Sequence, residues 1–357
     1  MEQKTGIRSR KIKRVTGYLM NLLLPLSAEG KLPGIRTIRE QTGAGQTCVM
    51  HALEKLEKEG LIRVVPNRGI FRVKPQERSD EIRLLHWSDA DLTDFGFLSV
   101  LLNALEGQAS LAGRKITTEK VGRRSQEEMA DELAFQGITR CIICGSKSTE
   151  FTLHLYKRMK VCLELLPRHS DRVVTELRDS PDMTVMQIGY LLKRGYRRIG
   201  CIHYGGRDMT VYPIHMMRLL DYYRLMAENH LYVNPEWVFH CGENYENLES
   251  GLSRILSSMP KPEALIVPGP AALGRLYSWC RKNKIRPGKD LAVFSCDDFN
   301  TKLSPEPTTI TNSPAEIAKT FWQMFLAAER GEKVESRYTE LFIRTGQTVP
   351  GLKTAAG

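Results

Sequence analysis

The chain has 357 residues, is 41% hydrophobic and carries a formal net charge of +11. This length and composition predict two or three ordinary globular domains. No run of about 18 apolar residues occurs, so no membrane-spanning helix is predicted. The basic start lacks the apolar core and cleavage site of a secretory signal, which predicts a cytoplasmic location.

The positive charge is concentrated at the start of the chain. Residues 1–80 hold 16 Lys and Arg against 8 Asp and Glu, whereas the rest of the chain holds 36 against 33. A basic segment suits the phosphate backbone of a nucleic acid, although a merely solvated basic face would have the same composition.

The first predicted helix covers residues 8–28. Basic residues at its start are expected to touch a DNA backbone, a contact that positions a protein without reading sequence: Arg8, Arg10, Lys11, Lys13 and Arg14. Apolar residues at helical spacing are expected to face inward: Ile12, Val15, Leu19, Leu22, Leu23 and Leu26.

Residues 32–73 predict a winged helix-turn-helix. A short helix over residues 35–43 leads through a Gly-containing turn into a longer helix over residues 45–60. A hairpin over residues 61–73 follows, with its turn at Pro66, Asn67 and Gly69. In such a domain the second helix enters the DNA major groove. One stripe of the longer helix is apolar: Val49, Ala52, Leu53 and Leu56.

This segment resembles the GntR-type DNA-binding domain. The similarity rests on a gap-free run: Leu32-Pro33, Arg36, Gly43, Val49, Ala52-Leu53, Leu56, Glu59 to Ile62, Arg68-Gly69 and Phe71. The run departs from the family at the start of the second helix. Gly45 replaces the usual Ser cap, and Gln46 and Met50 replace two Arg residues, so the DNA sequence that is read can differ from the family's common operators.

The resemblance implies a set of DNA-binding residues. Five residues are expected to meet the major groove: Arg36, Gln46, Thr47, Met50 and His51. Arg68 and Gly69, at the tip of the wing, are expected to approach the minor groove or the backbone. The alternative is a winged helix that serves protein contacts only, which the local basic charge disfavours.

Residues 75–80 are polar and predict a linker between a DNA-binding domain over residues 1–74 and a ligand-sensing domain over residues 81–357. From residue 81 short apolar strands alternate with amphipathic helices, which indicates parallel sheets with crossover helices. Ser125 and Glu128 have the spacing of a helix capping box. The last predicted strand covers residues 338–345.

The second half of this region resembles the effector domain of the lactose/galactose-repressor family, which shares its fold with periplasmic sugar-binding proteins. The similarity rests on residues 191–200 (LLKRGYRRIG), Arg218-Leu219 and residues 291–310 (LAVFSCDDFNTKLSPEPTTI), and at the level of the fold it covers about residues 81–346. A GntR-type head on such a body resembles the arabinose-repressor architecture. The fold class expected is an α/β body of two doubly wound parallel-sheet lobes with an N-terminal winged helix-turn-helix.

Ligands of such bodies bind at the carboxyl ends of strands, so polar residues just after strands are candidates. The resemblance implies that Asp297 binds sugar hydroxyls and that Arg218 reaches into the cleft. Loop capping, surface exposure or buried packing are the alternatives for these positions and for the other candidates. The full set is Ser88, Asp89, Ser146, Arg218, Asp297 and Phe299. Trp87 and Tyr245 are further aromatic residues that could face a sugar ring, with buried packing as the alternative.

Pro268-Gly269 stands where the family often has Asn-Asp, so the ligand need not be a common hexose or pentose.

The eight cysteines are scattered and are expected to be reduced and mostly buried. Cys141 and Cys144 are three residues apart in a predicted strand and so face opposite sides of a sheet, which disfavours a shared metal or disulfide. No catalytic motif is present, and we expect no metal, no cofactor and no enzyme activity.

These features predict a cytoplasmic transcription regulator that acts as a homodimer. We expect it to be a repressor rather than an activator. Its partners would be a double-stranded DNA operator and a small effector such as a sugar, with no membrane partner. A sugar-binding receptor without gene regulation and an enzyme derived from this fold are the alternatives.

Overall fold

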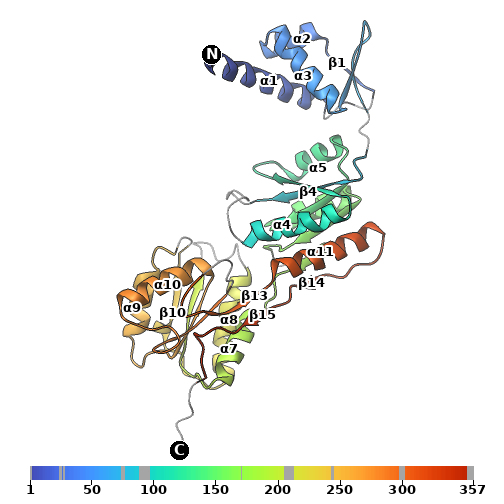
Figure 1. Cartoon of the computed structure of the whole chain (residues 1–357). Helices are drawn as coiled ribbons and strands as arrows, with labels where there is room; N and C mark the ends of the chain where they lie inside the picture. Colours follow the sequence, from blue (N-terminus) through green and yellow to red (C-terminus); the bar gives the residue numbers. More distant parts are fainter. Residues whose placement is uncertain are drawn as a thin grey trace, which may run out of the picture. The chain divides into compact units, whose positions relative to one another are not determined.

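The computed structural model describes residues 2–23, 26, 29–73, 77–87, 97–169, 171–204, 213–242, 245–296 and 302–351 (Figure 1). Internal contacts divide the chain into two compact units. The first holds Met1–Leu85, Arg114–Ile142 and Leu153–Cys162, and the second holds His86–Gly113, Ile143–Thr152 and Leu163–Gly357. The boundaries predicted at residues 74 and 81 stay a prediction.

The N-terminal segment forms the predicted winged helix-turn-helix. It consists of three helices and three short strands. Their order along the chain is α1 (Glu2–Leu23), β1 (Lys31–Leu32), α2 (Ile35–Thr42), α3 (Gln46–Lys58), β2 (Ile62–Val65) and β3 (Gly69–Arg72). The strands pair antiparallel in the order β1-β3-β2. Helix α1 ends at Leu23. Residues 24, 25, 27 and 28, which the prediction also placed in this helix, lie outside the described residues.

The turn between α2 and α3 depends on a glycine. Gly43 ends α2 with a φ of 61°, a left-handed conformation, and its N–H bonds to the carbonyl of Arg39. A residue with a Cβ is strained in this conformation, which explains the glycine at the bend between the two helices.

The apolar positions predicted for the head pack together in one core. From α1, Val15, Leu19 and Leu23 are buried, and Ile12 and Leu22 pack against them partly buried. Leu26, beyond the end of the helix, packs there as well. The predicted stripe of α3 is buried in full: Val49, Ala52, Leu53 and Leu56. The helices and strands of the head therefore share one core, to which Phe135 also belongs, and the opposite face of α3 is exposed to solvent.

A six-stranded sheet follows with the order β14-β8-β7-β6-β4-β5. Its strands are β4 (Glu81–His86), β5 (Lys115–Lys120), β6 (Arg140–Cys144), β7 (Val161–Leu165), β8 (Glu176–Arg178) and β14 (Arg337–Tyr338). The helices of this part are α4 (Phe97–Leu111), α5 (Gln126–Phe135) and α6 (Thr149–Arg158). The capping box predicted for α5 is present, with Ser125 and Glu128 bonding reciprocally.

A second six-stranded sheet has the order β10-β9-β11-β12-β13-β15. Its strands are β9 (Ile199–Tyr204), β10 (Val238–Cys241), β11 (Ala264–Val267), β12 (Ala292–Cys296), β13 (Thr308–Thr311) and β15 (Phe342–Arg344). The other helices are α7 (Met183–Lys193), α8 (Pro213–Glu228), α9 (Leu248–Ser257), α10 (Pro270–Lys282) and α11 (Pro314–Glu329). Helix α11 packs against α4 (Figure 1).

Helices cover both faces of the second sheet (Figure 1). Alternate strand residues show this, since Ala264 and Ile266 pack in one core with α7 and α8, while Leu265 and Val267 pack in another with α9 and α10. A parallel sheet buried on both faces confirms the expected doubly wound fold class.

One predicted element was wrong in detail. Residues 338–345, expected as one strand, contain the last residue of β14 and the whole of β15. β14 pairs parallel with β8 in one sheet, and β15 pairs antiparallel with β13 in the other. Apolar alternation alone does not show which sheet a short segment joins, because the pairing is a long-range choice.

The described cysteines form no disulfide, and all except the partly buried Cys296 are buried. Cys141 lies beside Cys162 on the neighbouring strand, with 3.3 Å between the sulfur atoms, and not beside Cys144. Among the described residues no helix is both long enough and apolar enough to cross a bilayer.

Candidate functional site

The exposed start of helix α3 is the first candidate surface. Gln46 and Thr47 are its first two residues and are exposed, as is His51 one turn on, while Met50 is half-buried against the head core. Gly45 caps the helix without a side-chain hydrogen bond. The first turn also lacks acidic residues, so no side chain of that turn offsets the partial positive charge at the start of the helix.

Arg36 stands on α2 with 92% of its side chain exposed. Its Nε lies 3.1 Å from Glu40 Oε1 in an exposed i,i+4 pair. Such pairs are worth at most about 1 kcal/mol, so Arg36 can exchange Glu40 for a phosphate or a base at little cost.

The wing presents Arg68 at its tip. Arg68 is exposed, and its N–H closes the turn onto the carbonyl of Val65 at 3.0 Å. Gly69 has a φ of 120°, and a Cβ there would lie 2.7 Å from the Cε of Lys31. The wing therefore needs glycine at this position. The side chain of Lys31 lies close to Gly69, so the wing carries a second positive charge besides Arg68.

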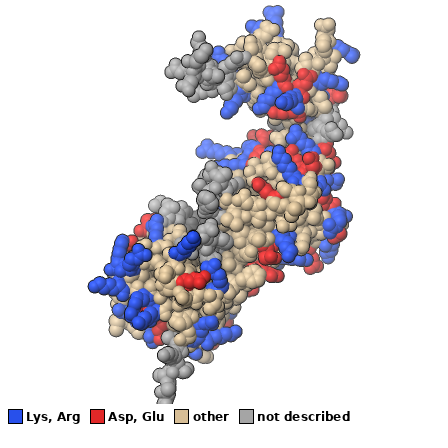
Figure 2. Space-filling model, viewed as in Figure 1, with Lys and Arg blue, Asp and Glu red and all other residues tan. Residues whose placement is uncertain are grey.

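Figure 2 shows Lys and Arg side chains on the visible face of the head with Asp and Glu side chains beside them. Ion pairs such as Arg63–Glu29 and Lys55–Glu59 account for part of this mixture. The structure thus leaves all seven predicted DNA-binding residues at least partly accessible, on α2, on α3 and in the wing; their contact with DNA stays a prediction.

The second candidate site is a cavity of 320 Å³ inside the second unit. Its polar lining comes from strand ends: His86 ends β4, Cys144 ends β6 and Asp179 follows β8. Arg218 of α8 and Asn312, which follows β13, also line it, and so do Arg168 and His215. This is the carboxyl-end position at which sheets of this type hold ligands.

Asp179 is the centre of the cavity's hydrogen bonds. Its carboxylate accepts from Arg218 Nη2 at 2.8 Å and from Asn312 Nδ2 at 2.9 Å. Among the described residues, the buried Nε of Arg218 has no hydrogen-bond partner. A buried donor without a partner is costly, so an acceptor on a bound ligand would stabilise this side of the cavity.

Two histidines in this part of the chain stay neutral near pH 7. Burial, together with the charges of Arg218 and other neighbours, lowers the pKa of His215 to about 3. Burial also lowers the pKa of His203, whose Nε2 lies 2.5 Å from the carbonyl of His215. His215 lines the cavity as a neutral imidazole, which can both donate and accept a hydrogen bond.

The remaining wall is apolar and includes one broad ring. Trp87 lines the cavity and packs edge-on against Phe151 with 5.1 Å between ring centroids. Phe97, Met183 and Ile214 add further apolar surface. An apolar wall with a few converging polar groups is the usual make-up of a small-molecule site.

The predicted ligand residues meet different outcomes. Arg218 lines the cavity, and its contact with a ligand stays a prediction. Ser146, in the loop before α6, is fully buried and bonds to Ser148 and to Thr152 of α6. It is not among the residues that line the cavity. The remaining four lie outside the described residues: Ser88, Asp89, Asp297 and Phe299.

Asp179, His215 and Asn312 were missed from the sequence. Asp179 and Asn312 each follow a strand, β8 and β13, that had not been identified as a strand. The rule of polar residues after strands would have found both of them. His215 carries no such signal, because it lies in the first turn of a helix.

The described residues that line the cavity do not form a nucleophilic or metal centre. Burial raises the pKa of Cys144 to about 12, so its sulfur stays a thiol, a poor nucleophile. The described residues hold no group of three or more His, Cys, Asp or Glu that could bind a metal ion.

Comparisons with known proteins divide the chain in the same way as the fold. Residues 12–71 match the model of the gntR family of bacterial regulatory proteins. Residues 188–348 match the model of the periplasmic binding protein-like domain.

Two curated relatives carry the name HTH-type transcriptional repressor PurR. The protein from Aliivibrio salmonicida is 20% identical over 207 residues, which cover 56% of this chain and 60% of that protein. The protein from Vibrio cholerae serotype O1 is 22% identical over 257 residues, covering 69% and 74%. The chain thus spans three fifths of the length of the first relative.

Solved structures show the same fold at low identity. A regulatory protein of the LacI family from Chloroflexus aggregans superposes with a TM-score of 0.65 at 16% identity, covering 76% of this chain and 98% of that one. The complex of transcriptional regulator CelR with cellobiose gives 0.60 at 15% identity, covering 89% and 100%.

The segment that matches the gntR family model lies in the three helices and the wing, and the segment that matches the periplasmic binding protein-like model includes the second six-stranded sheet. The chain therefore combines a DNA-binding domain of the gntR family of bacterial regulatory proteins with a periplasmic binding protein-like domain.

Proposed function

We propose that this protein is a sequence-specific transcription regulator, acting as a repressor, whose operator binding is controlled by a small molecule in the 320 Å³ cavity. One observation carries the proposal: the start of α3 is exposed on a winged helix-turn-helix whose sequence matches the gntR family. The repressor assignment is supported by the names of the two relatives.

In this proposal the residues of the head divide the work. Gln46 and Arg36 read base edges, since Gln pairs with adenine and Arg with guanine through two hydrogen bonds each. Arg68 at the wing tip holds the backbone or the minor groove. A homodimer places two such heads on a symmetric operator, whose half-site spacing follows from the dimer.

The cavity suits a polar small molecule, with sugars the first class to test. Arg218, Asn312 and neutral His215 offer hydrogen bonds to hydroxyl groups, and Trp87 offers a flat apolar face for a ring. The ligand changes operator binding only as far as it prefers one conformation of the protein over another.

A gel-shift titration with DNA from upstream of the gene tests the head. Replacing Arg36→Ala together with Gln46→Ala removes two base contacts and should weaken binding at least about thirtyfold. Lys58→Ala is the matched control, because it also removes one positive charge but lies at the other end of α3. Equal binding by the double variant and the wild type would contradict the assigned helix.

The competing function is a sugar-binding receptor without gene regulation, which the periplasmic binding protein-like domain favours. The same titration separates the two. A receptor binds its sugar and shows no salt-sensitive affinity for any DNA fragment, whereas the proposed regulator binds DNA and changes that affinity when its ligand is added.

A further inference from the structure

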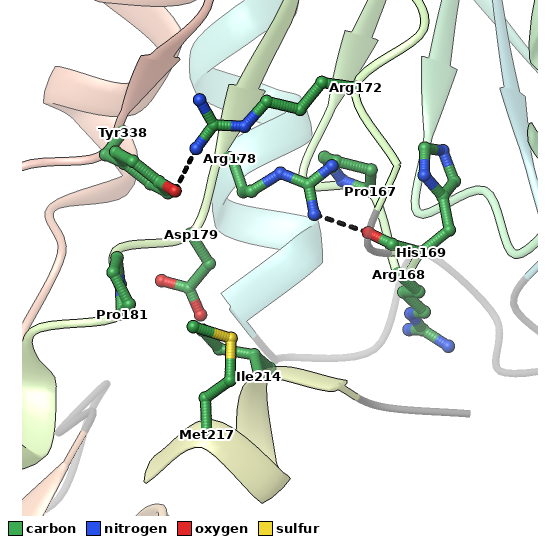
Figure 3. Close-up of a pocket in the computed structure, with 10 residues that line it drawn as sticks. All are labelled: Pro167, Arg168, His169, Arg172, Arg178, Asp179, Pro181, Ile214, Met217 and Tyr338. Carbon is green, nitrogen blue, oxygen red and sulfur yellow. Dashed lines mark hydrogen bonds between the residues drawn. The ribbon is translucent and has the colours of Figure 1, made fainter. Parts of the chain in front are cut away.

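Two arginines of a second, smaller cavity are held by neighbouring groups. This cavity of 180 Å³ lies next to the larger one and shares part of its lining. Arg178 donates to the carbonyl of His169, and Arg172 donates to the hydroxyl of Tyr338 (Figure 3). These contacts give both arginines a role inside the fold, which distinguishes them from Lys31 in the wing of the head.

Lys31 lies on the outer face of the wing sheet, the face that points away from the head core. β1 pairs with β3 so that Lys31 is opposite Phe71 and Leu32 is opposite Ile70. Leu32 and Ile70 are buried in the head core, and successive side chains of a strand point to opposite faces. Lys31 and Phe71 therefore share the outer face, where Lys31 is exposed to solvent.

The side chain of Lys31 runs along β3 towards the tip of the wing. A Cβ added at Gly69 would lie 2.7 Å from the Cε of Lys31 and 3.5 Å from its Nζ. Gly69 begins β3 directly after Arg68, the residue at the tip. Lys31 itself is opposite Phe71, two residues further from the tip. The missing side chain of Gly69 thus leaves a path for the lysine, whose ammonium group comes close to the tip.

The ring of Phe71 lies beside the same ammonium group. The Nζ of Lys31 is 5.9 Å from the centroid of this ring. An ammonium group at this distance from an aromatic ring is attracted to it, and the attraction favours some orientations of a flexible side chain over others. A lysine that is already oriented loses less conformational entropy when it binds a partner.

The acidic residue closest to Lys31 in the sequence is paired with another cation. The carboxylate of Glu29 lies 2.9 Å from the guanidinium of Arg63. No described residue forms an ion pair with Lys31. The neighbouring parts of the head outside the described residues contain no acidic side chain: residues 24, 25, 27, 28 and 74–76. None of these groups therefore neutralises the charge of Lys31.

We propose that Lys31 is a phosphate-binding residue of the wing, whose ammonium group contacts the DNA backbone beside the point where Arg68 approaches the DNA. Lysine carries a compact charge that attracts a phosphate without reading sequence. Phe71 and Gly69 are positioning residues, because the first orients the lysine and the second leaves space for it. The inference rests on the proposed function, since it adds a contact to the same DNA-binding surface.

A salt series of DNA binding by the full chain tests this. Fluorescence anisotropy follows a labelled duplex from upstream of the gene and an unrelated duplex of equal length. Lys31→Gln should reduce the slope of log affinity against log salt by about one and weaken binding about eightfold at about 100 mM salt, because fewer counterions are released. The factor should be equal for both duplexes, since a phosphate contact does not depend on sequence.

Three further variants complete the test. Lys31→Arg keeps the positive charge and should keep the slope of the wild type. Lys58→Gln is the matched control, because it also removes an exposed lysine but lies at the far end of α3, and it should bind as the wild type does. Phe71→Leu should weaken binding less than Lys31→Gln does, and should add nothing when the two are combined. A merely structural effect of Phe71→Leu would add to the loss in Lys31→Gln.

The outcomes separate this inference from the proposed function. The slope and affinity of the wild type in Lys31→Gln would overturn the inference and leave the regulator standing. A loss confined to the upstream duplex would also overturn it, because Lys31 would then read bases. Absence of DNA binding by the wild type has a different meaning, since it removes the regulator and every DNA contact assigned to its head.

Discussion

Asp179 joins two side chains that are far apart in the sequence. Its carboxylate binds Arg218 on α8 and Asn312 after β13, and Asn312 also bonds to Thr339 at 3.3 Å. Arg218 is only 13% exposed, so this carboxylate compensates its largely buried positive charge. The same residue thus organises the polar end of the cavity and stabilises the fold around it.

Asp179→Ala should lower the free energy of unfolding by about 1–3 kcal/mol, because it leaves the largely buried Arg218 without its anion. Denaturation in urea measures this. The matched control is Asp221→Ala, whose partner Arg224 is 50% exposed and pairs with Glu228 as well, so its loss should stay below about 1 kcal/mol. Equal losses in the two variants would show that Asp179 is not a stabilising centre.

Secondary-structure elements followed the sequence wherever a long periodic pattern or a cap defined them. Helix α3 buries its four predicted apolar positions, and α5 begins at the predicted capping box. The shortest strands could not be predicted from the sequence. β8, β14 and β15 have three residues or fewer, which is too few to show an alternation of apolar and polar residues. The residues that follow such strands, Asp179 among them, were missed for the same reason.

The cap of α5 gives a prediction at this scale. Ser125 accepts a hydrogen bond from the N–H of Glu128 at 3.2 Å, and the Glu128 side chain accepts one from the N–H of Ser125 at 2.9 Å. Ser125→Ala should cost about 1 kcal/mol of unfolding free energy. Ser253→Ala, at an exposed interior position of α9, should change it little. A cost no larger than this control's in urea denaturation would contradict a stabilising cap.

At the scale of the whole molecule, basic charge is divided unevenly along the chain. The first 80 residues hold eight more basic than acidic residues, and the rest holds three more. In the head, Arg36 on α2 and Arg68 at the tip of the wing are exposed. Exposed basic side chains suit the phosphate backbone of DNA.

This division predicts a strong dependence of DNA binding on salt. Four or more phosphate contacts by the head should weaken binding on the order of a hundredfold between 50 and 200 mM salt, because counterions are released from the DNA. Fluorescence anisotropy with a labelled duplex measures the slope. A slope near zero would show that the basic head does not contact the DNA backbone.

The sequence by itself determined the winged head, the alternating α/β body and the division of charge. Each of these depends on periodicity, caps and composition, which are local properties that neighbouring residues carry. Only the tertiary structure decided that Asp179, Arg218 and Asn312 meet, that Glu164 and Glu176 lie side by side, and that residues 337–344 serve two sheets. Those contacts join residues far apart in the chain, and the pairing of strands that creates them leaves no periodic trace in the sequence.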